Sequence, residues 1–147
     1  MTNILLITHN HVGSALLATA KRTVAEFPCE IKAVSIPQDA NLDITRTQIH
    51  STLGELDDGN GVLILTDMYG STPSNVAKSF LEQAEVPVKV LSGLNLPMLL
   101  RAINYSNLPL ANLAEKAFLG GRDGVCICTR SDKQHKVSYD SKVCHDN

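Results

Sequence analysis

The chain has 147 residues, a formal net charge of −2 and a pI near 6.2. This length favours a single domain that buries roughly two thirds of the surface exposed by its unfolded chain. Basic residues are scattered, which argues against a nucleic-acid partner, and no apolar run approaches the roughly 18 residues that membrane insertion needs. The four cysteines form no paired CxxC framework, so we expect free thiols and a cytoplasmic location.

In chain order, apolar runs of strand length alternate with segments of helical period. The predicted strands are residues 3–8, 31–36, 62–66, 86–92 and, after a break in the alternation, 124–129. The predicted helices are residues 12–26, 41–56, 73–84, 97–104 and 110–119. Asn41 is a candidate cap for the second helix, and Thr72, just before Pro73, for the third.

This alternation predicts an α/β fold, a doubly wound and mostly parallel sheet with helices on both faces. The first and third strands are almost continuously apolar, so both of their faces are expected to be buried. Beyond Arg130 the composition becomes polar. We therefore predict a domain over residues 1–130 and a loosely packed polar tail over residues 131–147.

Two reactive side chains follow the two most apolar strands. His9 comes after Ile4–Ile7 and Asp67 after Val62–Leu65. If the strands are parallel, the imidazole and the carboxylate meet at the carboxyl edge of the sheet, where open α/β folds place their active sites. A carboxylate that accepts a hydrogen bond from one ring nitrogen leaves the other nitrogen unprotonated and able to attack phosphorus. His11 is an alternative nucleophile, but its place in the loop or first helical turn favours His9.

The segment after Asp67 adds groups suited to phosphate. A helix that begins near Thr72 directs unpaired N–H groups and a positive dipole end towards the site, and Ser71 and Ser74 supply further hydroxyl donors. The simpler interpretation is that Thr72 only caps a helix and that Asp67 accepts from local amides. Their combination with His9 favours the phosphate-binding interpretation.

Four separated sequence blocks resemble one protein family, the mannose-family IIA domains of the phosphoenolpyruvate-dependent sugar phosphotransferase system. They are ILLITH at residues 4–9, GVLILTD with its GSTPSN continuation at 61–75, GLNLPML at 93–99, and GRDGV at 121–125. The resemblance covers residues 1–130 in the expected order. The sequence departs from the family pattern at Asn10-His11, where a small residue usually follows the active histidine, and at Tyr69-Gly70-Ser71.

The resemblance implies strand order 2-1-3-4 and a homodimer in which the late strand, residues 124–129, is exchanged and runs antiparallel at the partner's sheet edge. It further implies a phosphotransferase without a cofactor. His9 would take a phosphoryl group through Nε2 from the phosphocarrier HPr, Asp67 would orient the ring, and Thr72 would lie at the phosphate. The acceptor would be a separate IIB component, or the chain would be a regulatory relay that binds a partner according to its phosphorylation state.

Two other classes of function remain open from the sequence. Cys126, Cys128, Cys144 and His145 are ligand types that suit zinc, although Cys126 and Cys128 have the spacing of one strand face. A flavodoxin-like nucleotide or flavin site is disfavoured, because the loop from Thr8 to Gly13 has a single glycine and no Gly-rich phosphate fingerprint.

Overall fold

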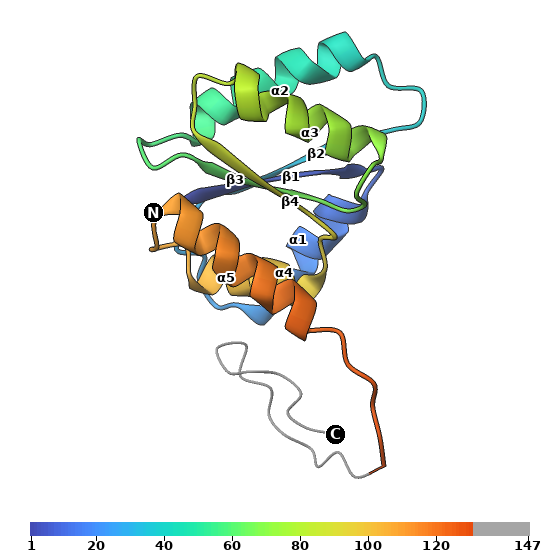
Figure 1. The fold of residues 1–147 in the computed structure, drawn as a ribbon, viewed down its shortest axis with the longest axis vertical. Helices are drawn as coiled ribbons and strands as arrows, with labels where there is room; N and C mark the ends of the chain where they lie inside the picture. The colour runs from blue at the N-terminus through green and yellow to red at the C-terminus, as the bar shows by residue number, and fades with distance from the viewer. Residues whose placement is uncertain (131–147) are drawn as a thin grey trace.

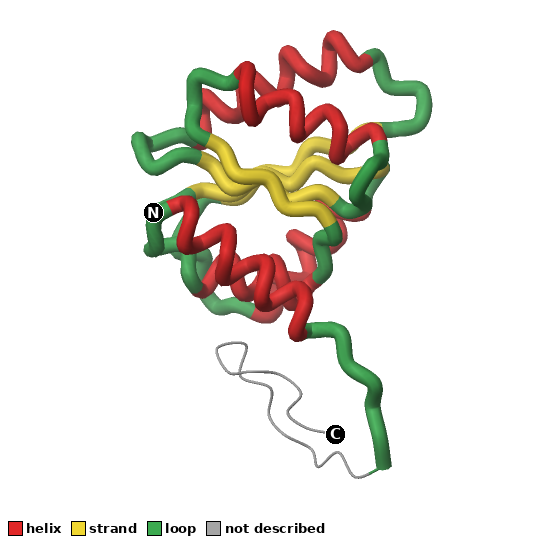
Figure 2. The backbone as a smooth tube through the Cα atoms, viewed as in Figure 1, coloured by secondary structure: helices red, strands yellow, loops and turns green. Residues whose placement is uncertain are grey.

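The computed structural model describes residues 1–130 as one sheet with helices on both of its faces (Figures 1 and 2). The predicted tail, residues 131–147, lies outside the described residues. The elements in chain order are β1 (Asn3–His9), α1 (Val12–Thr23), β2 (Ile31–Ile36), α2 (Leu42–Leu56), β3 (Val62–Thr66), α3 (Thr72–Gln83), β4 (Val88–Ser92), α4 (Leu96–Asn104) and α5 (Leu110–Asp123).

The four strands are parallel and lie in the order β2-β1-β3-β4, which confirms the predicted fold class and strand order. β1 is therefore a central strand. Ile7 of β1 is in register with Thr66 of β3, and His9 is in register with Ile36 of β2. This register brings the carboxyl ends of β1 and β3 side by side.

Both faces of β1 are buried, as its apolar run predicts. Ile4 and Leu6 pack into the core formed with α1, α4 and α5, whereas Leu5 and Ile7 pack into the core formed with α2 and α3. All four side chains are 0% exposed. Figure 1 shows the corresponding layers, with α2 and α3 above the sheet and α1, α4 and α5 below it. A strand between two helical layers needs apolar residues at successive positions, because both of its faces are buried. Its sequence therefore lacks the alternation of apolar and polar residues that a half-exposed strand shows.

Two helix ends differ from the prediction. α1 ends at Thr23 and not at residue 26, because Val24 takes an extended backbone and, with Phe27, packs against the core below the sheet. α5 continues through Gly120 to Asp123, beyond the predicted end at 119. A Cβ atom at Gly120 would lie 2.6 Å from the Cβ of Arg101. Glycine here permits close contact between α5 and α4, and does not end the helix.

Asn41 caps α2 as predicted. Its Oδ1 accepts hydrogen bonds from the backbone N–H groups of Asp43 at 3.0 Å and Ile44 at 3.2 Å.

β4 begins at Val88, two residues later than predicted. The carbonyl of Pro87, just before it, still accepts from the N–H of Val62 at 2.9 Å, while Pro87 itself has no N–H to donate.

The segment predicted as a late strand forms no strand in the described chain. Residues 125–129 have no regular secondary structure, and the side chains of Val125 and Ile127 are 77% and 93% exposed. A strand needs a hydrogen-bonding neighbour, and the sheet described for residues 1–130 has four strands. The exchange of this segment between two chains therefore stays a prediction.

The cysteines are only partly as predicted. Cys29 and Cys128 are free, and burial raises the pKa of the Cys29 thiol. Cys126 is disulfide-bonded, so the expectation of free thiols is wrong for this residue. Cys126 and Cys128, two residues apart, thus differ in their chemical state.

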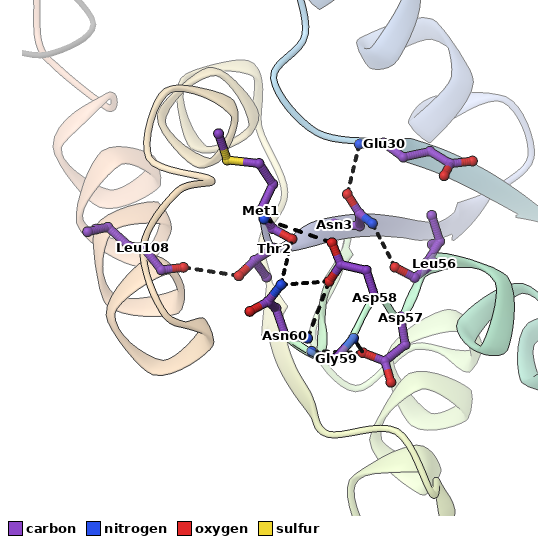
Figure 3. Close-up of polar contacts among 11 residues, drawn as sticks. Met1, Thr2, Asn3, Glu30, Leu56, Asp57, Asp58, Gly59, Asn60 and Leu108 are labelled. Atoms are coloured by element: carbon purple, nitrogen blue, oxygen red, sulfur yellow. Dashed lines mark hydrogen bonds and ion pairs between the residues drawn. The ribbon is translucent and has the colours of Figure 1, made fainter.

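At the amino edge of the sheet, Asn3 joins three elements (Figure 3). Its Nδ2 donates to the carbonyl of Leu56 at the end of α2 at 2.7 Å, and its Oδ1 accepts from the N–H of Glu30 before β2 at 2.9 Å. The side chain is buried. A buried amide with both ends bonded holds the starts of two strands at a fixed distance from α2.

We predict that Asn3→Ala lowers the free energy of unfolding by about 2–3 kcal/mol, because it leaves a buried carbonyl and an N–H without partners. Urea denaturation measures this change. Asn60→Ala is the control, since the Asn60 amide also bonds a backbone carbonyl, that of Met1, but is exposed; its loss should change stability by less than about 0.5 kcal/mol. Equal effects of the two substitutions would show that Asn3 has no such joining role.

Candidate active site

The structure brings His9 and Asp67 together at the carboxyl edge of the sheet. The ring Nδ1 of His9 lies 2.8 Å from Oδ2 of Asp67. His9 ends β1, and Asp67 follows the last residue of β3. The meeting predicted from the two apolar runs is therefore present, and the parallel register of β1 and β3 is its cause.

Asp67 is fixed by more than the imidazole. The backbone N–H of His9 also donates to Oδ2, at 3.1 Å, and the N–H of Met68 donates to Oδ1 at 3.1 Å. The side chain of Asp67 is 13% exposed and that of His9 is 39% exposed. The carboxylate is thus enclosed and held by backbone donors, while the ring that it orients remains open to a partner.

This geometry selects one tautomer of His9. A carboxylate oxygen accepts hydrogen bonds, so Nδ1 must carry the proton that lies between the two side chains. In the neutral ring, Nε2 then holds a lone pair. Within residues 1–130, Nε2 has no hydrogen-bond partner. The ring is therefore prepared to act as a nucleophile at Nε2.

The loop after His9 is fixed at both ends. Thr8 is buried, and its Oγ1 accepts from the N–H of Gly13 at 2.8 Å. Asn10 has a positive φ of 41°, which asparagine tolerates better than most residues, and its N–H donates to the carbonyl of Ile36 at 3.2 Å. His11 precedes α1 as its N-cap residue and is exposed. The alternative nucleophile thus lies on the helix side of this loop and has no bond to Asp67 among the described contacts.

The predicted cap of α3 is wrong by one residue. α3 begins at Thr72, and Ser71 is the N-cap. Ser71 does not cap the helix with its side chain, because its Oγ donates to the carbonyl of Met68 at 2.6 Å. The first N–H groups of an α-helix have no acceptor inside the helix. They therefore remain available for an anion at this end of α3.

The predicted phosphate-binding hydroxyls have different surroundings. Thr72 is exposed at the start of α3. Ser74 is 0% exposed, and its Oγ lies 3.1 Å from Oγ of Ser92, which in turn lies 2.9 Å from Oγ1 of Thr66. These buried hydroxyls connect the ends of β3 and β4 to the first turn of α3. Of the hydroxyls of Ser71, Thr72 and Ser74, only that of Thr72 has no hydrogen-bond partner among residues 1–130.

A cavity of about 390 Å³ opens above His9, between the starts of α2 and α3. Its lining comes from the ends of β1 and β2 and from the first residues of α2 and α3, namely His9, Asn10, Ile36, Pro37, Gln38, Ala40, Leu42, Thr72 and Pro73. At about 30 Å³ per molecule of liquid water, this volume corresponds to roughly a dozen waters. The cavity therefore has room for a phosphoryl group and part of a second molecule.

Sequence reasoning did not select Gln38 as a site residue. The available signal is its place, because Gln38 follows β2, whose carboxyl end lies at the same edge of the sheet as those of β1 and β3. Asn10 was noted only as a departure from a family pattern. Both residues line the cavity beside His9.

The zinc hypothesis gains no support from the described residues. Within residues 1–130, no group of three or more His, Cys, Asp and Glu side chains is arranged to hold a metal ion. Cys144 and His145 lie outside the described residues.

None of the helices in the described part of the chain has the length and apolar content that crossing a bilayer requires.

Comparisons with known proteins point to one family. A family model described as the fructose IIA component of the phosphotransferase system (PTS) matches residues 3–117. The mannose-specific EIIAB component of Escherichia coli K12 is 27% identical over 124 residues, which cover 83% of this chain and 38% of that protein. The fructose-specific EIIA component of Bacillus subtilis is 24% identical over 141 residues, which cover 94% of each chain. The chain thus spans well under half of the E. coli protein.

Solved structures of phosphotransferase system IIA proteins have the same fold as this chain. The mannose/sorbose-specific IIA subunit from Enterococcus faecalis superposes with a TM-score of 0.77 at 26% identity, covering 90% of this chain and 98% of that chain. A phosphotransferase system component EIIA from Streptococcus agalactiae gives a TM-score of 0.78 at 22% identity, covering 86% and 97%. The family model matches most of the chain, and the sheet order is the one that the resemblance implied; this chain therefore belongs to the mannose/fructose family of IIA components of the sugar phosphotransferase system.

Proposed function

We propose that this chain is a phosphocarrier whose Nε2 atom of His9 accepts a phosphoryl group from phospho-HPr and passes it to a IIB component. IIA components act as phosphotransfer carriers. The observation that supports His9 as the carrier is its 2.8 Å contact with Asp67, which leaves Nε2 unprotonated and directed away from the carboxylate. No cofactor is needed, because the imidazole itself is the nucleophile.

In the proposed step, the lone pair on Nε2 attacks the phosphorus of the donor phosphohistidine. A new N–P bond forms at His9, the N–P bond of the donor breaks, and the electron pair of that bond remains on the donor imidazole. The proton on Nδ1 stays in place, and the positive charge that develops on the ring faces the carboxylate of Asp67. The paired carboxylate thus stabilises the phosphorylated ring, as the aspartate of a hydrolytic triad does for its histidine.

We propose that the start of α3 binds the phosphoryl oxygens. Thr72 contributes its hydroxyl, and Ser74 contributes its backbone N–H, since no side chain caps this helix. Ser71 contributes indirectly, because its Oγ donates to the carbonyl of Met68 and so closes the turn that precedes this helix start. The exposed side chains of Met68 and Tyr69, directly after Asp67, provide apolar surface on which a protein donor or acceptor can dock.

We propose a cytoplasmic homodimer in which residues 124–129 add a strand to the partner's sheet. The support is that residues 125–129 have no regular secondary structure and that the side chains of Val125 and Ile127 are exposed. In addition, β2 and β4 are edge strands of the described sheet, with free hydrogen-bonding groups along one side.

Incubation with phosphoenolpyruvate, enzyme I and HPr should label the chain with one acid-labile, alkali-stable phosphate. His9→Ala should abolish this labelling, because it removes Nε2. His11→Ala is the matched control and should be labelled at the normal rate, because His11 has no contact with Asp67. Loss of labelling in the His11 variant alone would identify His11, and not His9, as the nucleophile. Labelling that survives both substitutions would contradict the phosphocarrier function.

Thr72→Val should slow phosphoryl transfer about tenfold to a hundredfold, because it removes a hydroxyl donor and keeps the shape of the side chain. Its free energy of unfolding should change by less than about 0.5 kcal/mol, since Thr72 is not the cap of α3. Transfer kinetics and urea denaturation measure the two effects. Thr72→Ser keeps the hydroxyl, loses only the methyl group and should transfer at nearly the normal rate; a valine variant as fast as the serine variant would show that the hydroxyl does not act as a donor in the transfer.

A further inference from the structure

The cavity above His9 contains two amide side chains with no role in the account so far. Its lining is a mixture of apolar and polar residues, and the polar ones are His9, Thr72, Asn10 and Gln38. Asn10 and Gln38 are exposed, and neither side chain has a hydrogen bond to any described residue. Each carries an NH₂ group with two donors. The apolar wall offers no other hydrogen-bonding side chain to an anion in this space.

The two amides approach the cavity from a different direction than Thr72. Asn10 follows β1 and Gln38 follows β2, whereas Thr72 begins α3, which follows β3. Because β1 lies between β2 and β3, the nucleophile is in the middle, with donors on both sides. α2 and α3 cover the same face of the sheet, so both walls belong to one cavity.

The charge of the lining adds a second argument. Among the described residues that line the cavity there is no Lys and no Arg. The nearest charged partner of His9 is the carboxylate of Asp67 on the opposite ring nitrogen. A phosphoryl dianion on Nε2 would therefore depend on neutral donors, and side-chain amides are donors of this kind.

We propose that Asn10 and Gln38 bind the phosphoryl oxygens on phospho-His9, opposite Thr72, and so form the second half of a neutral phosphoryl-binding pocket. This proposal rests on the proposed function, namely phosphorylation of Nε2. The backbone at Asn10 supports it, because the positive φ of 41° and the bond from its N–H to the carbonyl of Ile36 fix the point from which the amide extends.

The test uses substitutions that keep shape and backbone. Asn10→Asp and Gln38→Glu replace the NH₂ donor by an anionic oxygen of nearly the same size, and aspartate tolerates a positive φ almost as well as asparagine. Asn10→Gly and Gln38→Met delete the donor without adding charge. Gln48→Glu on the exposed side of α2 is the matched control for the added charge.

Each variant is phosphorylated from phospho-HPr and, separately, from phosphoramidate, a small donor that needs no protein docking. With both donors, Asn10→Asp and Gln38→Glu should slow phosphorylation of His9 by at least about tenfold, through repulsion and a lost donor. Asn10→Gly and Gln38→Met should slow it severalfold, and Gln48→Glu should have no effect.

The outcomes separate this proposal from the function on which it rests. If the unaltered chain takes no phosphate on His9 from either donor, the proposed function fails. If it is phosphorylated and the substitutions at Asn10 and Gln38 leave both rates unchanged, the amide pocket is wrong and the carrier function stands. Slowing with phospho-HPr but not with phosphoramidate would also overturn the proposal, because it would assign Asn10 and Gln38 to protein docking.

Discussion

A single oxygen atom, Oδ2 of Asp67, accepts from both the backbone N–H and the ring Nδ1 of His9. This double contact fixes the position of the residue and the orientation of its ring together. It is possible only because β1 and β3 are adjacent and parallel, so that the end of one strand faces the first residue after the other. The buried aliphatic side chains of these strands maintain that register, and the chemistry at the sheet edge depends on it.

The site combines one enclosed carboxylate with an otherwise neutral pocket. Asp67 lies on the Nδ1 side of His9, and the cavity that His9 lines has an uncapped helix start at Thr72 and no basic residue in its described lining. For a carrier, such surroundings have a physical advantage. A basic side chain would hold the phosphoryl group tightly and raise the barrier to its release, whereas neutral donors stabilise it more weakly. In the proposed function, the group must leave as readily as it arrives.

Much of this arrangement can be predicted from the sequence. The apolar runs before His9 and Asp67 indicate two buried parallel strands, and the meeting of the two side chains follows from that. The Ser71-Thr72-Pro73 segment indicates the start of a helix, but not which residue is the N-cap, because the choice depends on Ser71 Oγ bonding to Met68. Gly120 and Gly121 read as a helix end, since local propensity cannot reveal the close contact with α4 that they permit.

Other features depend on tertiary position and have no local signal. Gln38 becomes part of the site only because β2 lies beside β1. Ser74 looks like a phosphate ligand in sequence, yet its side chain is buried against Ser92 of β4. Residues 124–129 have the sequence pattern of a strand, yet the four-stranded sheet of the described residues does not include them.

The tautomer of His9 tests the central claim most directly. Two-dimensional ¹H–¹⁵N NMR of the unphosphorylated chain, recorded where the ring is neutral, distinguishes a protonated from an unprotonated ring nitrogen. The contact with Asp67 predicts a proton on Nδ1 and a lone pair on Nε2. A ring of His9 protonated at Nε2 would contradict this account, because the atom assigned to attack phosphorus would then have no electron pair available.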